Sequence, residues 1–188
     1  MPCETESNHP ERWLDEHGDA LYAYALLRVR EPAAAEDLVQ DALIAGWLAR
    51  GEYRGGAELR TWLIGILKHK IIDHLRKAGR EVRLEMPEES EDPMLHKFDD
   101  TGHWLTAPVE FRDPSAILEN DELRHALLNC IDKLPSALRQ AFVLREFDGL
   151  DTPTLIATLG LSGANNLWVM LSRAREKLRA CLEGYWRT

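Results

Sequence analysis

Residues 81–115 lack the regular spacing of apolar side chains that the sequence shows on either side of them. They contain the run EVRLEMPEESEDP and two further prolines, Pro108 and Pro114. A segment of this composition buries too little apolar surface to offset the entropy lost on ordering. We therefore expect two folded blocks joined by an extended linker, in a chain of 188 residues that is long enough for two small domains.

Before the linker, apolar residues recur every three or four positions, as they do on one face of an α-helix. The predicted helices cover Trp13–Val29, a segment from about Ala33 to the glycine-containing loop at 51–56, and about Glu58–Ala78. Pro32 separates the first two helices. The expected buried face of the first helix is Leu14, Leu21, Ala25 and Val29, and that of the third is Trp62, Ile66, Leu67, Ile71 and Leu75.

After the linker, the apolar pattern is that of further helices. The first follows the stripe Leu123, Ala126, Leu127, Cys130, Ile131 and Leu134, and the second runs from about Ser136 to Phe147. A short third helix is predicted with Thr152 as its N-cap, Pro153 in its first turn and Gly160 as its left-handed C-cap. Ser162 is the expected N-cap of a long last helix.

The last two helices, joined by the tight turn LGLS, have the form of a helix-turn-helix motif. The second helix of such a motif lies in the DNA major groove. Its polar side chains are candidate DNA contacts, because asparagine pairs with adenine and arginine with guanine or phosphate. They are Asn165, Asn166, Ser172, Arg173 and Arg175. The pattern alone fits an ordinary antiparallel helix pair, with solvated arginines, equally well.

Charge is distributed unevenly along the chain, whose net charge is −9. Residues 1–20 sum to −5 and residues 81–122 to −10, whereas residues 21–80 and 123–188 each sum to +3. The two basic blocks suit contact with nucleic acid. The acidic segment between them discourages non-specific DNA binding by the free protein, since that affinity depends on counterion release.

The polar, acidic start MPCETESNHPERW is unlike a secretory signal, and no apolar run approaches the roughly 20 residues of a membrane span. We therefore expect a cytoplasmic protein. Disulfides are not expected there, so Cys130 and Cys181 are interpreted as small core residues. Cys3 and His9 supply only two of the four ligands of a structural zinc site, and we predict neither a metal nor another cofactor.

Two long segments resemble a known family. The sequence LPSALRQAFVLREFDGLDTPTLIATLGLSGANNLWVMLSRAREKLRACL (134–182) resembles region 4 of sigma-70 family factors, and AEDLVQDALIAGWLARGEYRGGAELRTWLIGILKHKIIDHLRK (35–77) resembles region 2. Both look like the extracytoplasmic-function (ECF) group, and the resemblance covers about 20–184. It implies an all-α fold of two small helical domains, a region 2 helical bundle and a region 4 helix-turn-helix, joined by an acidic flexible linker.

The resemblance implies an alternative sigma factor, not an enzyme, that binds core RNA polymerase and directs promoter-specific initiation. The corresponding boundaries are a flexible tail over 1–12, region 2 over 13–80, the linker over 81–120 and region 4 over 121–188. Region 2 would read the −10 element and region 4 the −35 element. By composition the linker is equally well a plain solubilising segment or, as in the family, a polyanion drawn into the RNA exit path of the polymerase.

By resemblance, Asp37, Gln40 and Asp41 contact the β′ clamp helices of the polymerase, although solvated helix-face residues would look the same. The residues expected at the −10 element are Tyr53, Arg54, Lys68, His69, Lys70, Arg76, Lys77 and Arg80. Trp47 and Trp62 are interpreted as core residues and not as stacking platforms for bases. Other implied partners are the β flap, promoter DNA and a cognate anti-sigma factor, often membrane-associated or zinc-binding, with no small-molecule substrate.

The sequence departs from the family in two places. Thr154 stands where many relatives have an acidic residue, and SGANN is one residue longer than the usual turn, which leaves the register of the recognition helix open. Two rivals remain: a dimeric helix-turn-helix regulator that binds duplex DNA unaided, and an adaptor that holds polymerase without reading DNA. No catalytic constellation is visible in the sequence.

Overall fold

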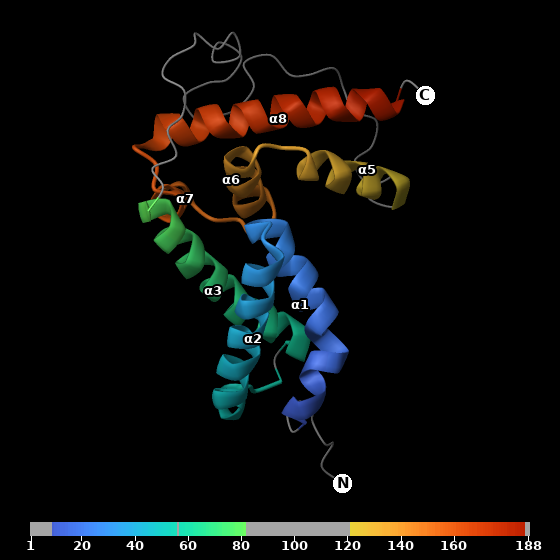
Figure 1. Ribbon diagram of the computed structural model, residues 1–188, viewed down its shortest axis with the longest axis vertical. Helices are drawn as coiled ribbons and strands as arrows, with labels where there is room; N and C mark the ends of the chain where they lie inside the picture. Colours follow the sequence, from blue (N-terminus) through green and yellow to red (C-terminus); the bar gives the residue numbers. More distant parts are fainter. Residues whose placement is uncertain (1–8, 56, 82–120, 187–188) are drawn as a thin grey trace. The chain divides into compact units, whose positions relative to one another are not determined.

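The computed structural model describes residues 9–55, 57–81 and 121–186, and all regular structure in these ranges is helical (Figure 1). The chain divides into two compact units, Met1–Glu81 and Val82–Thr188. The predicted fold class, two small helical domains, is confirmed. The predictions made for the first eight residues and for residues 82–120, which include Cys3 and nearly all of the acidic linker, lie outside the described residues.

Three helices form the N-terminal unit, and each packs against the other two (Figure 1). They are α1 (Trp13–Val29), α2 (Pro32–Leu48) and α3 (Leu59–Glu81), with short 3₁₀ turns at Pro10–Arg12 and Arg50–Glu52. The predicted bounds of α1 are confirmed. Pro32 opens α2, because a proline fits the first turn of a helix, where its missing N–H has no partner to lose.

The core of this unit differs from the prediction at several large apolar residues, among them Leu14 and Trp47. The buried face of α1 includes Trp13, which is 1% exposed, whereas Leu14 is 59% exposed, so the assignment of Leu14 to the core is wrong. The two residues are consecutive and therefore point about 100° apart around the helix. Trp47 is 53% exposed, and its interpretation as a core residue is also wrong.

Gly46 marks a close approach between α2 and its neighbours. A Cβ atom at this position would lie 2.8 Å from Cδ2 of Leu63 in α3 and 3.3 Å from Cζ3 of Trp13 in α1. A methyl group at this position would force the side chains of Leu63 and Trp13 to shift. The absence of a side chain at Gly46 is therefore what allows α2 to pack against both helices at this point.

Four described helices form the C-terminal unit: α5 (Asp121–Asp132), α6 (Ser136–Glu146), α7 (Thr152–Leu159) and α8 (Ala164–Trp186). The other three all pack on α8 (Figure 1). The stripe that α8 buries is Leu167, Met170, Leu171, Ala174 and Leu178. Among the described residues no single helix is long and apolar enough to cross a membrane, although α7 and α8 together, bent by 90° at their junction, pass that test of length and composition.

The ends of α7 and α8 correct two predicted caps. Asp151, not Thr152, is the N-cap of α7, and its carboxylate accepts a hydrogen bond of 2.9 Å from the backbone N–H of Thr154. Hydrogen bonding from Thr154, by its side chain first and then by its backbone, lowers the pKa of Asp151. Ser162 is not the cap of α8, which begins two residues later at Ala164. Gly160 has the left-handed conformation that was predicted.

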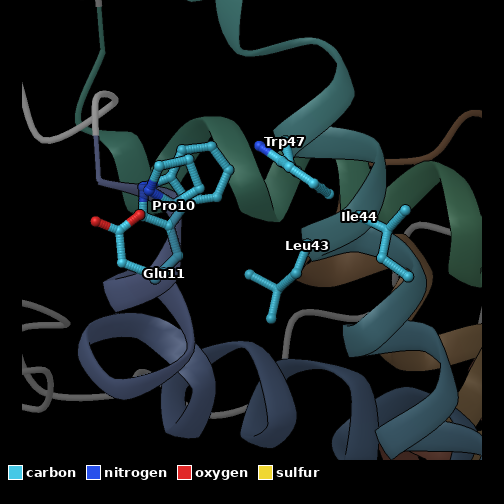
Figure 2. A pocket seen from close by; sticks show the side chains of 6 residues that line it. Pro10, Glu11, Leu43, Ile44 and Trp47 are labelled. Atoms are coloured by element: carbon cyan, nitrogen blue, oxygen red, sulfur yellow. The ribbon is translucent and has the colours of Figure 1, made fainter.

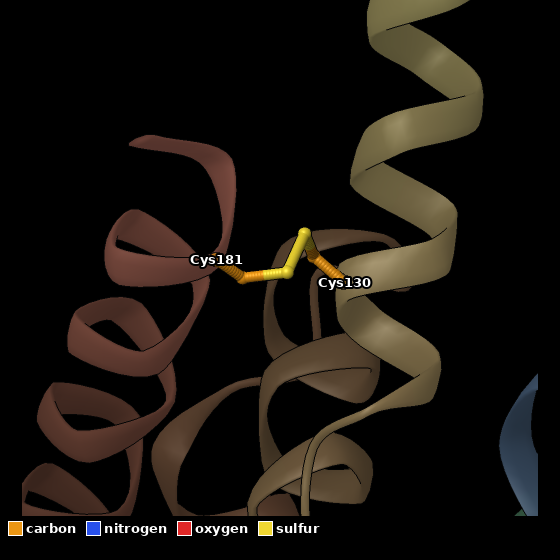
Figure 3. The surroundings of a disulfide bond; sticks show 2 residues. All are labelled: Cys130 and Cys181. Carbon is orange, nitrogen blue, oxygen red and sulfur yellow. A yellow bond between two sulfur atoms is a disulfide. The ribbon is translucent and has the colours of Figure 1, made fainter. Parts of the chain in front are cut away.

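A disulfide joins Cys130 of α5 to Cys181 of α8, with a Cα–Cα distance of 5.9 Å (Figure 3). The expectation that these cysteines form no disulfide is therefore wrong, whereas the interpretation of Cys130 as a core residue is confirmed. Each cysteine does lie on an apolar stripe, as the sequence indicates. Which stripes face each other is decided by tertiary packing, and the two cysteines are 51 positions apart, so the sequence does not reveal that they are close in space.

Replacing Gly46 with alanine is expected to destabilise the N-terminal unit by about 1–3 kcal/mol, because the added methyl group overpacks the contact with Leu63 and Trp13. Gly65→Ala is the matched control. Gly65 lies inside α3, and a Cβ atom added there would meet no atom within 4 Å, so alanine should stabilise α3 by up to about 1 kcal/mol. Urea unfolding of both variants checks the pair, and equal effects would contradict the close approach at Gly46.

Candidate functional site

One exposed face of α2 combines polar and apolar side chains. Asp37, Gln40 and Asp41, the expected polymerase contacts, are all exposed, and their spacing places them on the same side of the helix. The same side continues toward the end of α2 with Ile44, Trp47 and Leu48, which are 55%, 53% and 75% exposed. We call these six residues the α2 outer face. Its apolar half was not predicted from the sequence, although the spacing of three or four residues from Asp41 onward would have revealed it.

A hollow of about 380 Å³ lies beside the apolar half of the α2 outer face (Figure 2). Trp47, Ile44 and Leu43 line it from α2, and Pro10, Glu11 and Trp13 line it from the 3₁₀ turn at Pro10–Arg12 and the start of α1. The guanidinium of Arg50 lies 5.9 Å from the centre of the Trp47 ring and donates a hydrogen bond of 2.8 Å to the Trp47 carbonyl. Trp47 is thus an exposed aromatic residue held in place from one side.

A second hollow, of about 460 Å³, lies between the loop after α2 and the first turns of α3. It brings together Tyr53, Arg54 and His69, three of the residues expected at the −10 element. The ring of Tyr53 lies 5.3 Å from that of Trp62, which is half-buried and also contacts Trp13 at 6.3 Å. The lining residues are Glu52, Tyr53, Arg54, Ala57, Thr61, Trp62, Gly65, Ile66 and His69.

The expected basic track on α3 divides over more than one face of the helix. His69 and Arg76 are seven residues apart and share a face, and so do Lys70 and Lys77 on the neighbouring side. Lys68, Lys70 and Arg76 are half-buried, whereas Lys77 is exposed. Arg76 also lies 3.4 Å from the Asp73 carboxylate, which offsets part of its charge. Arg80 belongs to α3, and its side chain lies outside the described part of the chain.

The start of α8 presents some, but not all, of the expected −35 contacts. Asn165 is exposed, and Asn166 and Arg173 are partly exposed. Ser172 is only 7% exposed, so the expectation that its side chain is exposed is wrong, although it lies about 100° around the helix from Leu171 and outside the apolar stripe of α8. Trp168 and Val169 are partly exposed between Asn165 and Arg173, and they were not predicted because only polar residues were considered as DNA contacts.

Arg175, another expected −35 contact, has a partner inside the protein. Its guanidinium lies 2.7 Å from the carboxylate of Glu146 at the end of α6. The preceding residue of α6, Arg145, lies over the ring of Trp168 at 5.9 Å and donates a hydrogen bond of 2.9 Å to the carbonyl of Leu150. The end of α6 therefore holds α8 at two points, and Arg175 contributes to the position of the recognition helix whatever else it contacts.

Two family models match this arrangement. The model for Sigma-70 region 2 matches residues 13–81, and the model for Sigma-70, region 4 matches residues 124–178, which together make up more than half of the 188 residues. The chain belongs to the sigma-70 family of RNA polymerase sigma factors. The region 2 match covers α1, α2 and α3, and the region 4 match lies within the unit that ends in α8.

Curated relatives of this sigma factor carry consistent names. It is 34% identical over 164 residues to a probable RNA polymerase sigma factor of Haemophilus influenzae, covering 86% of this chain and 84% of that protein. It is 30% identical over 123 residues to the ECF RNA polymerase sigma-E factor of Escherichia coli, covering 65% and 61%. It is a sigma factor of the ECF group and therefore a transcription initiation factor, not an enzyme.

Solved structures similar to this sigma factor include the sigma factor RpoE in complex with the anti-sigma factor NepR from Bartonella quintana. The two chains share 24% identity with a TM-score of 0.43, over 92% of this chain and 96% of that one.

Within the described ranges, no group of three or more histidine, cysteine, aspartate or glutamate side chains is placed to hold a metal ion.

The Arg175–Glu146 ion pair is expected to contribute about 0.2–1 kcal/mol to the stability of region 4, because both side chains are partly exposed to solvent. Arg175→Ala and Glu146→Ala should therefore cause non-additive losses in a double-mutant cycle that is measured by urea unfolding. The Arg179–Glu183 pair, which lies within α8 alone, serves as a control that cannot affect the docking of α6. Strictly additive losses at Arg175 and Glu146 would exclude the pairing.

Proposed function

We propose that this sigma factor binds core RNA polymerase through the α2 outer face and that regions 2 and 4 read the −10 and −35 promoter elements. The observation that carries the proposal is the exposure of Asp37, Gln40 and Asp41 on one side of α2, together with the apolar residues that follow them. A protein that served only as a helical scaffold would have no need to expose Trp47, Ile44 and Leu48 in one patch.

The chemistry of the α2 outer face suits the polymerase clamp helices. Asp37 and Asp41 offer carboxylates one turn apart, which form directional, charge-assisted hydrogen bonds with arginines of a partner helix. Trp47 and Ile44 offer apolar area that becomes buried on docking. Tryptophan is enriched among the residues that dominate interface energetics. We therefore expect the polar end to set the orientation of binding and the apolar end to supply most of the affinity.

The hollow between the loop after α2 and α3 suits an unpaired base of the −10 element. Its volume of about 460 Å³ lies within the range of small-ligand pockets, roughly 300–1,000 Å³. Aromatic rings of Tyr53 and Trp62 stand at its wall, and stacking on such rings is a sequence-tolerant way to hold a base. Arg54 and the basic residues of α3, including Lys77, would bind the phosphates beside it.

Region 4 would contact the −35 element through the start of α8. Asn165 and Asn166 lie in its first turn, the part of a recognition helix that meets base edges. Arg173, two turns later, would bind a guanine or a phosphate. With Ser172 buried, we add Trp168 and Val169 to the surface that faces the groove, where Val169 suits contact with a thymine methyl group.

The remaining partners follow from membership of the family. We infer contact with the β flap, control by a cognate anti-sigma factor and action in the cytoplasm, where the polymerase and its promoters are. The boundaries 1–12, 13–80, 81–120 and 121–188 stay our proposal for the tail, region 2, linker and region 4. The linker, with its high negative charge, would enter the polymerase channel that otherwise holds RNA.

Run-off transcription tests the proposed function. Purified core RNA polymerase is incubated with a genomic library of promoter fragments, with and without this protein. Transcripts that start downstream of a shared bipartite motif only when the protein is present support a promoter-specificity factor. If no transcript appears and the protein alone shifts duplex DNA as a dimer, it is a repressor-type regulator; if it holds polymerase without selecting promoters, it is an adaptor.

Trp47→Ala is expected to weaken binding to core polymerase tenfold or more, because the α2 outer face loses its largest apolar side chain. Leu14→Ala is the matched control, since Leu14 is also an exposed apolar residue, 59% exposed on α1, but lies off this face. Competition binding with a fluorescent sigma factor measures both. Equal affinities for the two variants would remove the apolar half of the α2 outer face from the interface.

A further inference from the structure

The disulfide between Cys130 and Cys181 serves no purpose in polymerase or promoter binding as described above. Cys130 lies in the last turn of α5 and is 1% exposed, whereas Cys181 lies near the end of α8 and is partly exposed (Figure 3). The two cysteines are 51 positions apart in the sequence, and the stretch between them contains α6, α7 and the recognition half of α8. It therefore connects the first described helix of region 4 to the last.

The two cysteines lie where α5 packs on α8. Ala126 and Ile131 of α5 are buried, as is Leu178 one turn before Cys181 in α8, so α5 docks on α8 through apolar contacts. The resulting Cα–Cα distance of 5.9 Å lies inside the range of about 4.4–6.8 Å that a disulfide needs. The reduced protein should therefore keep the same fold and hold its two thiols ready to bond.

Thiol reductants in the cytoplasm disfavour a permanent disulfide. A factor that works on polymerase and promoters, as the proposed function requires, shares the cytoplasm with thiol reductants. Disulfides are rare there, and those that form are usually transient, as in redox sensing. A preorganised pair of thiols, one buried and one accessible, is the arrangement that such a transient bond needs.

We propose that Cys130 and Cys181 form a reversible redox modification site whose oxidant is a peroxide. The thiolate of Cys181, the more accessible sulfur, attacks one peroxide oxygen and breaks the O–O bond. This step gives a sulfenic acid on Cys181 and releases the other oxygen as water. Cys130 then attacks the sulfur of Cys181 and displaces its hydroxyl group, which takes up the remaining proton and leaves as a second water.

The balance is two thiols and one hydrogen peroxide for one disulfide and two waters, with two electrons passing from sulfur to oxygen. A dithiol reductant reverses the reaction by two successive thiol–disulfide exchanges, in which the reductant becomes the disulfide. Cys181 is again the sulfur that the reductant attacks first, because Cys130 is shielded inside the unit.

Oxidation acts on the stability of region 4 and not on its contacts with DNA. A cross-link between cysteines 51 positions apart lowers the chain entropy of the unfolded state and so stabilises the folded one. Cys181 lies about 24 Å along α8 from Asn165, at 1.5 Å per residue, so the bond does not reach the promoter-facing end of the helix. The oxidised factor should therefore read the same promoters but remain active where the reduced factor has unfolded.

The first test follows the thiol chemistry in the full chain. Reduced, desalted protein is treated with hydrogen peroxide and analysed by intact mass and by peptide mapping after alkylation. The expected result is a monomer that has lost the mass of two hydrogens, a Cys130–Cys181 linked peptide, and full reversal by dithiothreitol. Cys181→Ser should abolish the link and Cys3→Ser should leave it unchanged. A link through Cys3, or none at all, would overturn the site.

The second test follows stability. The melting temperature of the oxidised wild type should exceed that of the reduced form by on the order of 10 °C. Cys181→Ser should melt at the same temperature with and without peroxide. Cys130→Ala removes the other cysteine of the bond and should also melt at the same temperature with and without peroxide. It replaces Cys181→Ser as the control if the serine itself disturbs folding. Identical melting of the oxidised and reduced wild type would contradict the proposal.

The third test is run-off transcription from a −35-dependent promoter at a temperature between the two melting points. The oxidised factor should stay active at this temperature. The activity of the reduced factor should be at least tenfold lower, without a change in base preference. Equal activity of the two forms would overturn the regulatory role. Loss of transcription by both forms at low temperature would refute the proposed function instead, while mass and melting would still decide the thiol chemistry.

Discussion

The contact of Gly46 with Leu63 and Trp13 fixes which side of α2 faces the core. A helix turns as a rigid body, so burying Gly46 together with Ala42 and Leu38 also determines what points outward. The outward side is the one that carries the carboxylates and Trp47. The α2 outer face is thus the side of the helix opposite its buried residues, and Gly46 extends that buried side to the end of α2.

In region 4, the buried side of a single helix, α8, likewise determines which side chains face solvent. The stripe of α8 that begins at Leu167 faces α5, α6 and α7, which leaves the side with Asn165 and Arg173 toward solvent. Two contacts from the end of α6 then set the rotation of α8, through Trp168 and Arg175. Promoter-facing residues are therefore positioned by side chains that themselves need not contact any base.

Periodicity in the sequence predicted the helices well, because it reports the length and the buried face of each helix directly. Periodicity did not predict features that depend on a single residue, such as which of two neighbours is buried or which residue is the N-cap. Trp13 and Leu14 are both large and apolar, and only tertiary packing selects between them. Asp151 precedes Thr152, and both are good N-caps, so the choice rests on the geometry of the turn. The pairing of Cys130 with Cys181 depends on how α5 docks, which no local pattern encodes.

Because α8 is long, its promoter-facing side chains and Cys181 lie far apart on one helix. Its 23 residues extend about 35 Å, with the promoter-facing side chains at one end and Cys181 near the other. Mutations at either end act through different neighbours and leave the other end unchanged. A lineage of such factors is therefore free to gain or lose the cysteine pair without altering its regulon, and to change its regulon without altering its response to oxidants.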